Sequence, residues 1–361
     1  MNGRAIVIGV VVLGLMAVAA VGAPPAPSEK PKKATPARPP SRRQSASPSL
    51  NPALAAATAT AAMAATMVAT MPATERTFVR ALDTAPFPYE GKYADTQVDF
   101  FDAVDPQTGR RFHTNRYGQR FAEADHYRDA SVLFHLSPGF DPSRPFSLVF
   151  FFHGNQSSAS DSFRDFRLGE QLDRAGRNAV LIVPQLARQA ADSSPGKFFR
   201  AGAFKAFLAD VAATLAERCG AAHLERFRQA PLVLIGFSGG YKSVAYILDR
   251  GGATSRVKAV LLLDALYEDV DKFSAWLTRN PGRRAFVLLA GKGTSSASNG
   301  RALAHFLRQH GVATAKSWPT ALGPDGIHVV ETTTEHLKIP VAGPPTLPIA
   351  SFLRALEVRT R

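Results

Sequence analysis

The chain has 361 residues, 45% of them hydrophobic, and a formal net charge of +14. This length and composition suffice for the full core of one large α/β domain with appendages. The single cysteine, Cys219, excludes an intramolecular disulfide. Because no zinc, helix-turn-helix or RNA-binding signature accompanies the positive charge, nucleic acid is not an expected partner.

The first 23 residues have the pattern of an export signal. Residues 6–23 are almost purely apolar, follow Arg4 and end in small residues, which predicts a secretory signal peptide. An apolar run of this length is also just long enough to remain as a membrane anchor, so cleavage and retention both stay open. In either case we expect an exported protein that is periplasmic, secreted or anchored facing outside the cytoplasm.

Residues 24–75 are rich in Pro, Ala, Ser and Thr and contain no aromatic residue. Such a segment cannot bury enough surface to offset the entropy lost on ordering, so we expect a disordered linker. Its Lys and Arg residues make it basic, which suggests weak attraction to anionic lipid or to a polyanionic envelope polymer. The folded domain is expected at residues 76–361.

The first part of the folded domain has antiparallel character. Residues 96–104 and 110–114 flank a turn signal at 105–109, which predicts a hairpin. Residues 130–136 predict a further strand. We expect these strands to form the antiparallel edge of a mixed sheet.

From residue 147 onward, apolar runs alternate with helical patterns. Strands are predicted at 147–152, 179–183, 232–235, 257–263, 284–290 and about 312–318, with helices before 232, after 240 and at 299–309. This alternation implies right-handed crossovers and a mostly parallel α/β sheet covered by helices on both faces. Ligands in such sheets bind beyond the carboxyl ends of the strands, so the polar segment 185–203 is expected to wall the site.

Residues 236–240, Gly-Phe-Ser-Gly-Gly, lie between an apolar run and an amphipathic helical pattern. Strand, tight turn and helix form the context in which a G-x-S-x-G motif presents a nucleophilic serine. Gly236 and Gly240 leave room around the strained turn, and the first N–H groups of the helix point at charge that develops beside the serine. We predict that Ser238 is a nucleophile. The alternative is a glycine-rich turn that holds a phosphate or in which Ser238 caps the helix.

The segment that follows the strand at 147–152 is His-Gly-Asn-Gln. An acyl oxygen that gains charge in a transition state needs two N–H donors, each worth about 3 kcal/mol. We expect the Gly239 N–H to be one donor and the N–H of Asn155 or Gln156 to be the other. An ordinary turn is the alternative for this segment.

These motifs resemble the α/β-hydrolase superfamily: HGN after a buried strand, GFSGG at a strand-to-helix turn, and a late histidine. The resemblance covers about residues 76–361. It implies an eight-stranded, mostly parallel sheet with helices on both faces, and a serine, acid, histidine triad in that chain order.

The acid departs from the usual pattern of that superfamily, in which it follows the next-but-one strand after the nucleophile. Here that segment, 289–296, contains no carboxylate. Asp264 lies one strand earlier, directly after the apolar run 257–263, at a position some lipase-like members resemble. A carboxylate there must be paired or hydrogen-bonded, and a histidine N–H would satisfy it. The alternatives are an N-cap role for Asp264, with Glu268 or Asp269 as the acid.

Two histidines, His328 and His336, follow the last predicted strand, where the resemblance places the base. His336 lies in a polar loop that runs into an apolar segment, and we favour it. His328 lies between Ile327 and Val329 and is explained as a packed strand residue, so it is the alternative base.

The predicted function is therefore that of an exported serine hydrolase that cleaves acyl esters through Ser238, His336 and Asp264 and an acyl-enzyme. The substrate class is a small acyl ester or an acylated envelope glycan. Amide hydrolysis, acyl transfer to another acceptor, and a catalytically silent binding domain of the same fold are the alternatives. No cofactor is expected, and without an H-E-x-x-H or comparable spacing no metal is expected either.

Overall fold

The computed structural model describes residues 75–94, 96–279 and 285–356. The predicted signal segment and nearly all of the predicted linker lie outside the described residues. Within the described residues, no helix combines the length and the apolar character that crossing a bilayer requires.

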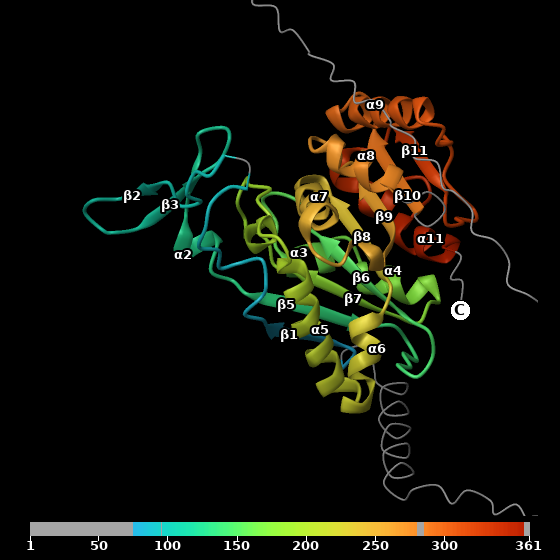
Figure 1. Cartoon of the computed structure of the whole chain (residues 1–361), viewed down its shortest axis with the longest axis horizontal. Coiled ribbons are helices and arrows are strands. Elements are labelled where there is room, and N and C mark those ends of the chain that lie inside the picture. Colours follow the sequence, from blue (N-terminus) through green and yellow to red (C-terminus); the bar gives the residue numbers. More distant parts are fainter. Residues whose placement is uncertain (1–74, 95, 280–284, 357–361) are drawn as a thin grey trace, which may run out of the picture. The chain divides into compact units, whose positions relative to one another are not determined.

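Eight strands form the main sheet, and all but the first two junctions are parallel (Figure 1). In spatial order they are β1 (Thr77–Ala81), β5 (Ser131–Leu136), β7 (Ala179–Pro184), β6 (Ser147–Phe152), β8 (Leu232–Phe237), β9 (Val257–Leu263), β10 (Ala285–Gly291) and β11 (Ile327–Thr332). The predicted eight-stranded, mostly parallel sheet is confirmed, and the carboxyl ends of its parallel strands meet at one edge.

The antiparallel edge differs from the prediction. The expected hairpin exists, but β2 (Ala103–Val104) and β3 (Arg111–Thr114) join β4 (Arg120–Ala122) in a separate three-stranded sheet. The edge of the main sheet is instead β1 beside β5. The hairpin strands are short and mostly half-buried, so they lack the run of fully buried apolar residues that a strand between two helix layers requires.

The last strand also differs. Residues 312–318 contribute only the single bridge between Ala315 and His328, and β11 forms the edge instead. The stretch at 312–318 is mostly half-exposed or exposed, whereas β11 buries four of its six residues against its neighbours.

Helices cover both faces of the main sheet. One face packs α5 (Ala203–Cys219), α6 (Leu224–Gln229), α7 (Tyr241–Arg250), α8 (Val270–Arg279) and α9 (Ser295–Gln309). The other packs α3 (Ala159–Asp165), α4 (Leu168–Ala175), α10 (Ile339–Ala342) and α11 (Pro348–Ala355). Successive residues of one strand serve opposite faces, so that Phe150 contacts the first layer and Phe151 the second.

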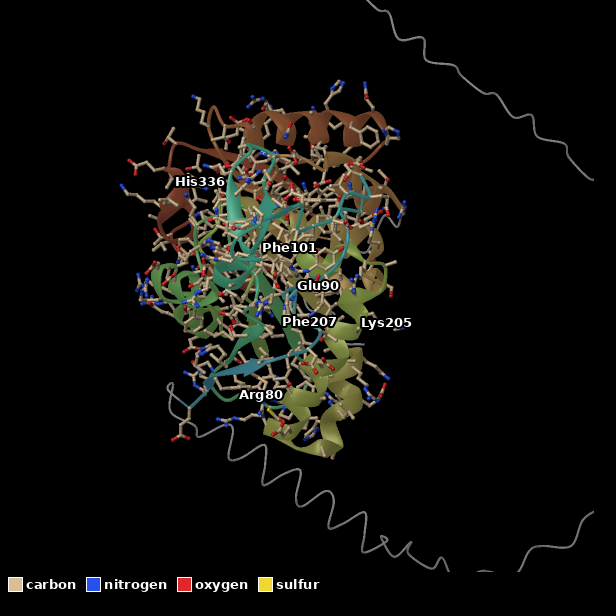
Figure 2. The ribbon with its side chains drawn as sticks, turned by 90° about the vertical axis from the view of Figure 1, so that its left-hand side faces the viewer. Arg80, Glu90, Phe101, Lys205, Phe207 and His336 are labelled. Carbon is tan, nitrogen blue, oxygen red and sulfur yellow. The ribbon has the colours of Figure 1, made fainter. Side chains whose placement is uncertain are left out.

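Helix α5 buries its apolar side and exposes its polar side. In α5, Phe207 points into the interior while Lys205 lies at the outer surface (Figure 2). This is the apolar stripe that its sequence pattern predicts.

Residues 82–130 leave the main sheet between β1 and β5, and we call this segment the arm. It contains β2, β3, β4 and the short helix α2 (Glu123–His126), which lie apart from the main sheet (Figure 1). An apolar cluster joins its base to the segment after β7 and to α7; its buried members are Phe87, Tyr89, Phe100, Tyr127, Ala187, Ala190, Phe199 and Tyr246.

Candidate active site

Ser238 lies directly after β8, at the start of the 3-10 turn Ser238–Gly240 that leads into α7. Its φ angle is 50°, in the left-handed region that non-glycine residues rarely adopt. The turn needs glycine at position 240, because a Cβ there would lie 2.1 Å from the Phe152 carbonyl oxygen. Strand, strained turn and helix thus lift the serine hydroxyl above the carboxyl end of the sheet.

The structure brings Ser238, His336 and Asp264 together from three separate segments. His336 Nε2 lies 2.9 Å from Ser238 Oγ, and His336 Nδ1 lies 2.7 Å from Asp264 Oδ2. Because a carboxylate only accepts, His336 donates through Nδ1–H to Asp264. Its Nε2 is then left to accept the Ser238 hydroxyl proton.

Asp264 follows β9, is fully buried and also has a left-handed backbone, with φ of 42°. Besides His336, its carboxylate accepts from the Gly291 N–H at 3.0 Å and from the Thr294 hydroxyl at 3.0 Å. Burial raises the pKa of this carboxyl group, but the hydrogen bonds from His336, Gly291 and Thr294 outweigh burial, so the pKa lies below its usual value. Asp264 is therefore held as a carboxylate.

The imidazole of His336 lies against aromatic rings. It stacks on Phe237, with ring centroids 4.9 Å apart and planes 24° from parallel. Tyr267 stands edge-on at 6.5 Å and also donates its hydroxyl to Asp264 at 3.3 Å. These contacts fix the ring plane, so both nitrogens keep their partners.

The alternative residues lie elsewhere. His328 is in β11, where its Nδ1 donates to the Ser317 carbonyl oxygen at 2.7 Å. Glu268 pairs with Arg116 and Lys242, and Asp269 pairs with Lys272 at 2.7 Å. Among the described residues, none of these three side chains forms a hydrogen bond or an ion pair with Ser238.

The two predicted donor segments face each other. A Cβ at Gly239 would lie 2.2 Å from Asn155 Oδ1, so the residue after Ser238 packs directly on Asn155. The Gln156 N–H donates to the Ala190 carbonyl oxygen at 2.7 Å and is thereby occupied. Among the described residues no acceptor is paired with the backbone N–H of Asn155 or Gly239, which leaves these two donors available.

His153 anchors the segment that carries Asn155, a role that the sequence did not reveal. Its Nδ1–H donates to the Gly154 carbonyl oxygen at 2.9 Å, and its Nε2 accepts from the Leu186 N–H at 2.9 Å. Burial lowers the pKa of His153 to about 4, so the ring is neutral at neutral pH. It ties the end of β6 to the end of β7.

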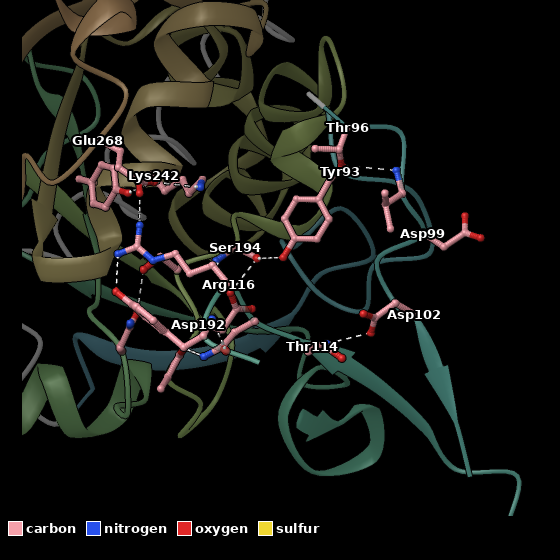
Figure 3. A pocket seen from close by; sticks show the side chains of 17 residues that line it. Tyr93, Thr96, Asp99, Asp102, Thr114, Arg116, Asp192, Ser194, Lys242 and Glu268 are labelled. Atoms are coloured by element: carbon pink, nitrogen blue, oxygen red, sulfur yellow. Dashed lines mark hydrogen bonds and ion pairs between the residues drawn. The ribbon is translucent and has the colours of Figure 1, made fainter. Parts of the chain in front are cut away.

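A cavity of about 300 Å³ borders Asn155, and Ser238, Asp264 and His336 are not among the residues that line it (Figure 3). The arm, the turn Ala191–Ser194 and the start of α7 line it, so part of the predicted wall at 185–203 does border it. Its side chains are mostly polar, and the charged ones are Asp99, Asp102, Arg116, Asp192, Lys242 and Glu268. In the part of the chain that the structure describes, no three His, Cys, Asp or Glu side chains group as metal ligands would.

No family model matches this chain, and no curated protein does. Among solved structures, it is similar to a ferulic acid esterase, with a TM-score of 0.42, 11% identity, and coverage of 62% of this chain and 93% of the other. It is also similar to a feruloyl esterase module from Clostridium thermocellum, with a TM-score of 0.40, 15% identity, and coverage of 72% of this chain and 95% of the other. For S-formylglutathione hydrolase from Staphylococcus aureus, the TM-score is 0.38 and the identity 8%, with coverage of 68% of this chain and 95% of the other. These likenesses concern the fold.

The order of the eight strands and the strained serine turn after β8 are features of one architecture. The chain order Ser238, Asp264, His336 at the carboxyl ends of the strands belongs to the same architecture. The chain has the α/β-hydrolase fold.

Proposed function

We propose that the protein is a serine hydrolase of acyl esters, with Ser238 as nucleophile, His336 as general base and Asp264 as the carboxylate that orients the imidazole. The observation that carries the proposal is the continuous chain of contacts from Asp264 through His336 to Ser238, at 2.7 and 2.9 Å. Both distances are within hydrogen-bond reach, as proton transfer requires.

The reaction follows from the positions of these groups. His336 Nε2 takes the Ser238 hydroxyl proton as Oγ attacks the acyl carbon, and the N–H groups of Asn155 and Gly239 stabilise the oxyanion. The protonated imidazole then returns the proton to the departing alcohol oxygen, leaving an acyl-enzyme. A water molecule, deprotonated by the same nitrogen, attacks the acyl carbon and releases the acid and free Ser238.

The cavity favours a small or hydroxyl-rich ester over a long-chain lipid. Its volume is about 300 Å³ and its lining includes six charged side chains, whose desolvation by an alkyl chain would be costly. We accordingly propose a small acyl ester or an acylated glycan of the cell envelope as substrate. An envelope glycan can be the substrate only if the protein is exported, and the apolar segment 6–23 supports export.

The test is labelling of the full chain with a fluorophosphonate probe, together with turnover of p-nitrophenyl acetate. We expect wild type to be labelled and active, and Ser238→Ala to lose labelling and to drop to the background rate. Ser243→Ala is the matched control, because Ser243 is a buried serine of α7 outside the site. A folded wild type with no Ser238-dependent labelling would point instead to a catalytically silent domain.

A further inference from the structure

The arm is bonded to the turn Ala191–Ser194 by polar side chains. Asn115 Nδ2 donates to the Ala191 carbonyl oxygen at 2.8 Å. The Tyr127 hydroxyl donates to Asp192 Oδ2 at 3.2 Å, and the Tyr93 hydroxyl lies 3.2 Å from Ser194 Oγ (Figure 3). Three arm residues distant in sequence from the turn thus converge on it.

Asp192 is the centre of this junction. Its side chain is 6% exposed, and its Oδ1 accepts from the Ser194 N–H at 3.0 Å and from the Ser194 hydroxyl at 2.7 Å. Burial, followed by the charge of Asp192, raises the pKa of Tyr127, which therefore stays a donor. A buried carboxylate is tolerated only while its donors stay in place, so the turn is held in one geometry.

The same turn holds the segment after β6. Ser193 Oγ donates to Asn155 Oδ1 at 2.9 Å. The Gln156 N–H donates to the Ala190 carbonyl oxygen at 2.7 Å, and the Gln189 N–H donates to the Ser157 carbonyl oxygen at 2.9 Å. Hydrogen bonds thus hold both the side chain of Asn155 and the backbone of the two residues that follow it.

Asn155 and Ser193 also pack on the residue after the nucleophile. A Cβ at Gly239 would lie 2.6 Å from Ser193 Oγ as well as 2.2 Å from Asn155 Oδ1. The turn therefore lies against Gly239 and against the side chain of Asn155, the two residues whose N–H groups are proposed to hold the oxyanion. A shift of the turn would move these residues relative to each other.

We propose that Asp192 and Ser193 are positioning residues through which the arm sets the place of the Asn155 N–H relative to Gly239. The inference rests on the proposed function, since it assigns these residues to the oxyanion site of that reaction. The role assigned to the junction is stabilisation of the transition state, because a misplacement of about 1 Å can cost on the order of 10²-fold in rate.

The experiment compares Ser193→Ala, Ser193→Thr and Asp192→Asn in the full chain, with p-nitrophenyl acetate as substrate and phenylboronic acid as a transition-state analogue. For Ser193→Ala we expect kcat to fall about tenfold, and for Asp192→Asn between about 10- and 100-fold, with KM changed less than twofold. The affinity for the boronic acid should fall by the same factor as kcat. Ser193→Thr, which keeps the hydroxyl, should recover most of the rate.

Asp125→Asn is the matched control, because it breaks the exposed ion pair with Arg110 in the same arm without touching the turn. If Asp192→Asn unfolds, Tyr127→Phe removes a single donor to the same carboxylate and takes its place. Unchanged kcat and boronic acid affinity in folded Ser193→Ala and in folded Asp192→Asn or Tyr127→Phe would overturn the inference. Loss of Ser238-dependent turnover in wild type would overturn the proposed function instead.

Discussion

The Asp264 carboxylate is fully buried and meets four donors, from His336, Gly291, Thr294 and Tyr267. These hydrogen bonds leave the carboxylate little freedom to rotate, and they keep it ionised in the absence of substrate. The orientation of His336 follows from this, because the imidazole has one strong acceptor on its Nδ1 side. A preorganised acceptor of this kind costs no reorganisation during the reaction.

Asp264→Asn should lower kcat/KM for p-nitrophenyl acetate by roughly 10³- to 10⁴-fold, the scale known for the same change in serine proteases. The amide can donate to His336 Nδ1, which favours the tautomer that cannot accept the Ser238 proton. Steady-state kinetics measure the effect, with Asp271→Asn, an exposed carboxylate of α8, as control. A loss smaller than tenfold in folded protein would show that another carboxylate serves His336.

His153 makes the stability of the fold depend on pH. Its pKa is about 4 in the folded protein against about 6.5 for an exposed histidine. Between these values the unfolded chain binds the proton and the folded chain does not, so stability falls as the pH drops from 6.5 towards 4. The full loss is on the order of 3 kcal/mol.

Urea unfolding of wild type and His153→Gln at pH 7 and at pH 4.5 measures this contribution. The wild type should lose more stability than the variant between the two pH values. His305→Gln, on the exposed side of α9, should lose as much as the wild type. Equal losses in all three proteins would exclude His153 as the source.

At the scale of elements, the side chain of Gln171 in α4 connects the end of α3 with α10 and α11. Its fully buried amide nitrogen donates to the carbonyl oxygens of Phe166 and Pro340, at 2.9 and 2.8 Å. Its amide oxygen accepts from the Ile349 N–H at 3.0 Å, one of the first N–H groups of α11, which has no partner within its helix. Because the 3-10 turn His336–Lys338 runs directly into α10, this one side chain also holds the segment that carries His336.

Gln171→Leu should lower the free energy of unfolding by about 3 kcal/mol or more, since several buried polar groups lose their partner at once. It should also reduce kcat at temperatures where the variant is still folded, because the His336 loop loses its bond at Pro340. Urea unfolding and steady-state kinetics test both effects. Gln229→Leu, which removes only an exposed contact with Glu225 in α6, should change neither by more than a few tenths of a kcal/mol.

Local sequence patterns predict some features of the candidate site, but not the contacts between residues that lie far apart in the sequence. Ser238 follows the apolar strand β8, and Asp264 follows the apolar residues 259–263 of β9; this local pattern is enough to place both at the carboxyl edge of the sheet. The contact of Ser193 with Asn155 spans 38 residues, and the junction of Tyr127 with Asp192 spans 65. No local pattern records such pairs, because turn and arm residues acquire their role only when the chain brings them together.

Local pattern also misplaced two edges of the sheet. Strand β1 is five residues long and mostly exposed, so it lacks the apolar alternation that marks a half-buried strand. The run at 312–318 has strand-like composition but pairs through one residue only. Edge strands are defined by what they lie beside, which a single sequence does not contain.

At the scale of the whole molecule, the predicted export signal and linker precede the domain that brings Ser238, Asp264 and His336 together. Expression of the full chain with its own first residues should deliver activity outside the cytoplasm. N-terminal sequencing of the exported protein separates a cleaved signal, with a new terminus near Ala23, from a retained anchor with the original terminus. Activity confined to the cytoplasm would contradict the prediction.

The Thr294 hydroxyl shows where the acid that pairs with His336 can lie. Thr294 lies in the segment 289–296, where the resemblance would place a carboxylate, and its hydroxyl is 3.0 Å from Asp264 Oδ1. Two carboxyl groups within hydrogen-bond distance of each other cannot both ionise at neutral pH. The ends of β9 and β10 can therefore hold only one ionised carboxylate. The two placements of the acid are mutually exclusive. A carboxylate introduced at position 294 would lie close to Asp264, and one of the two would have to be protonated.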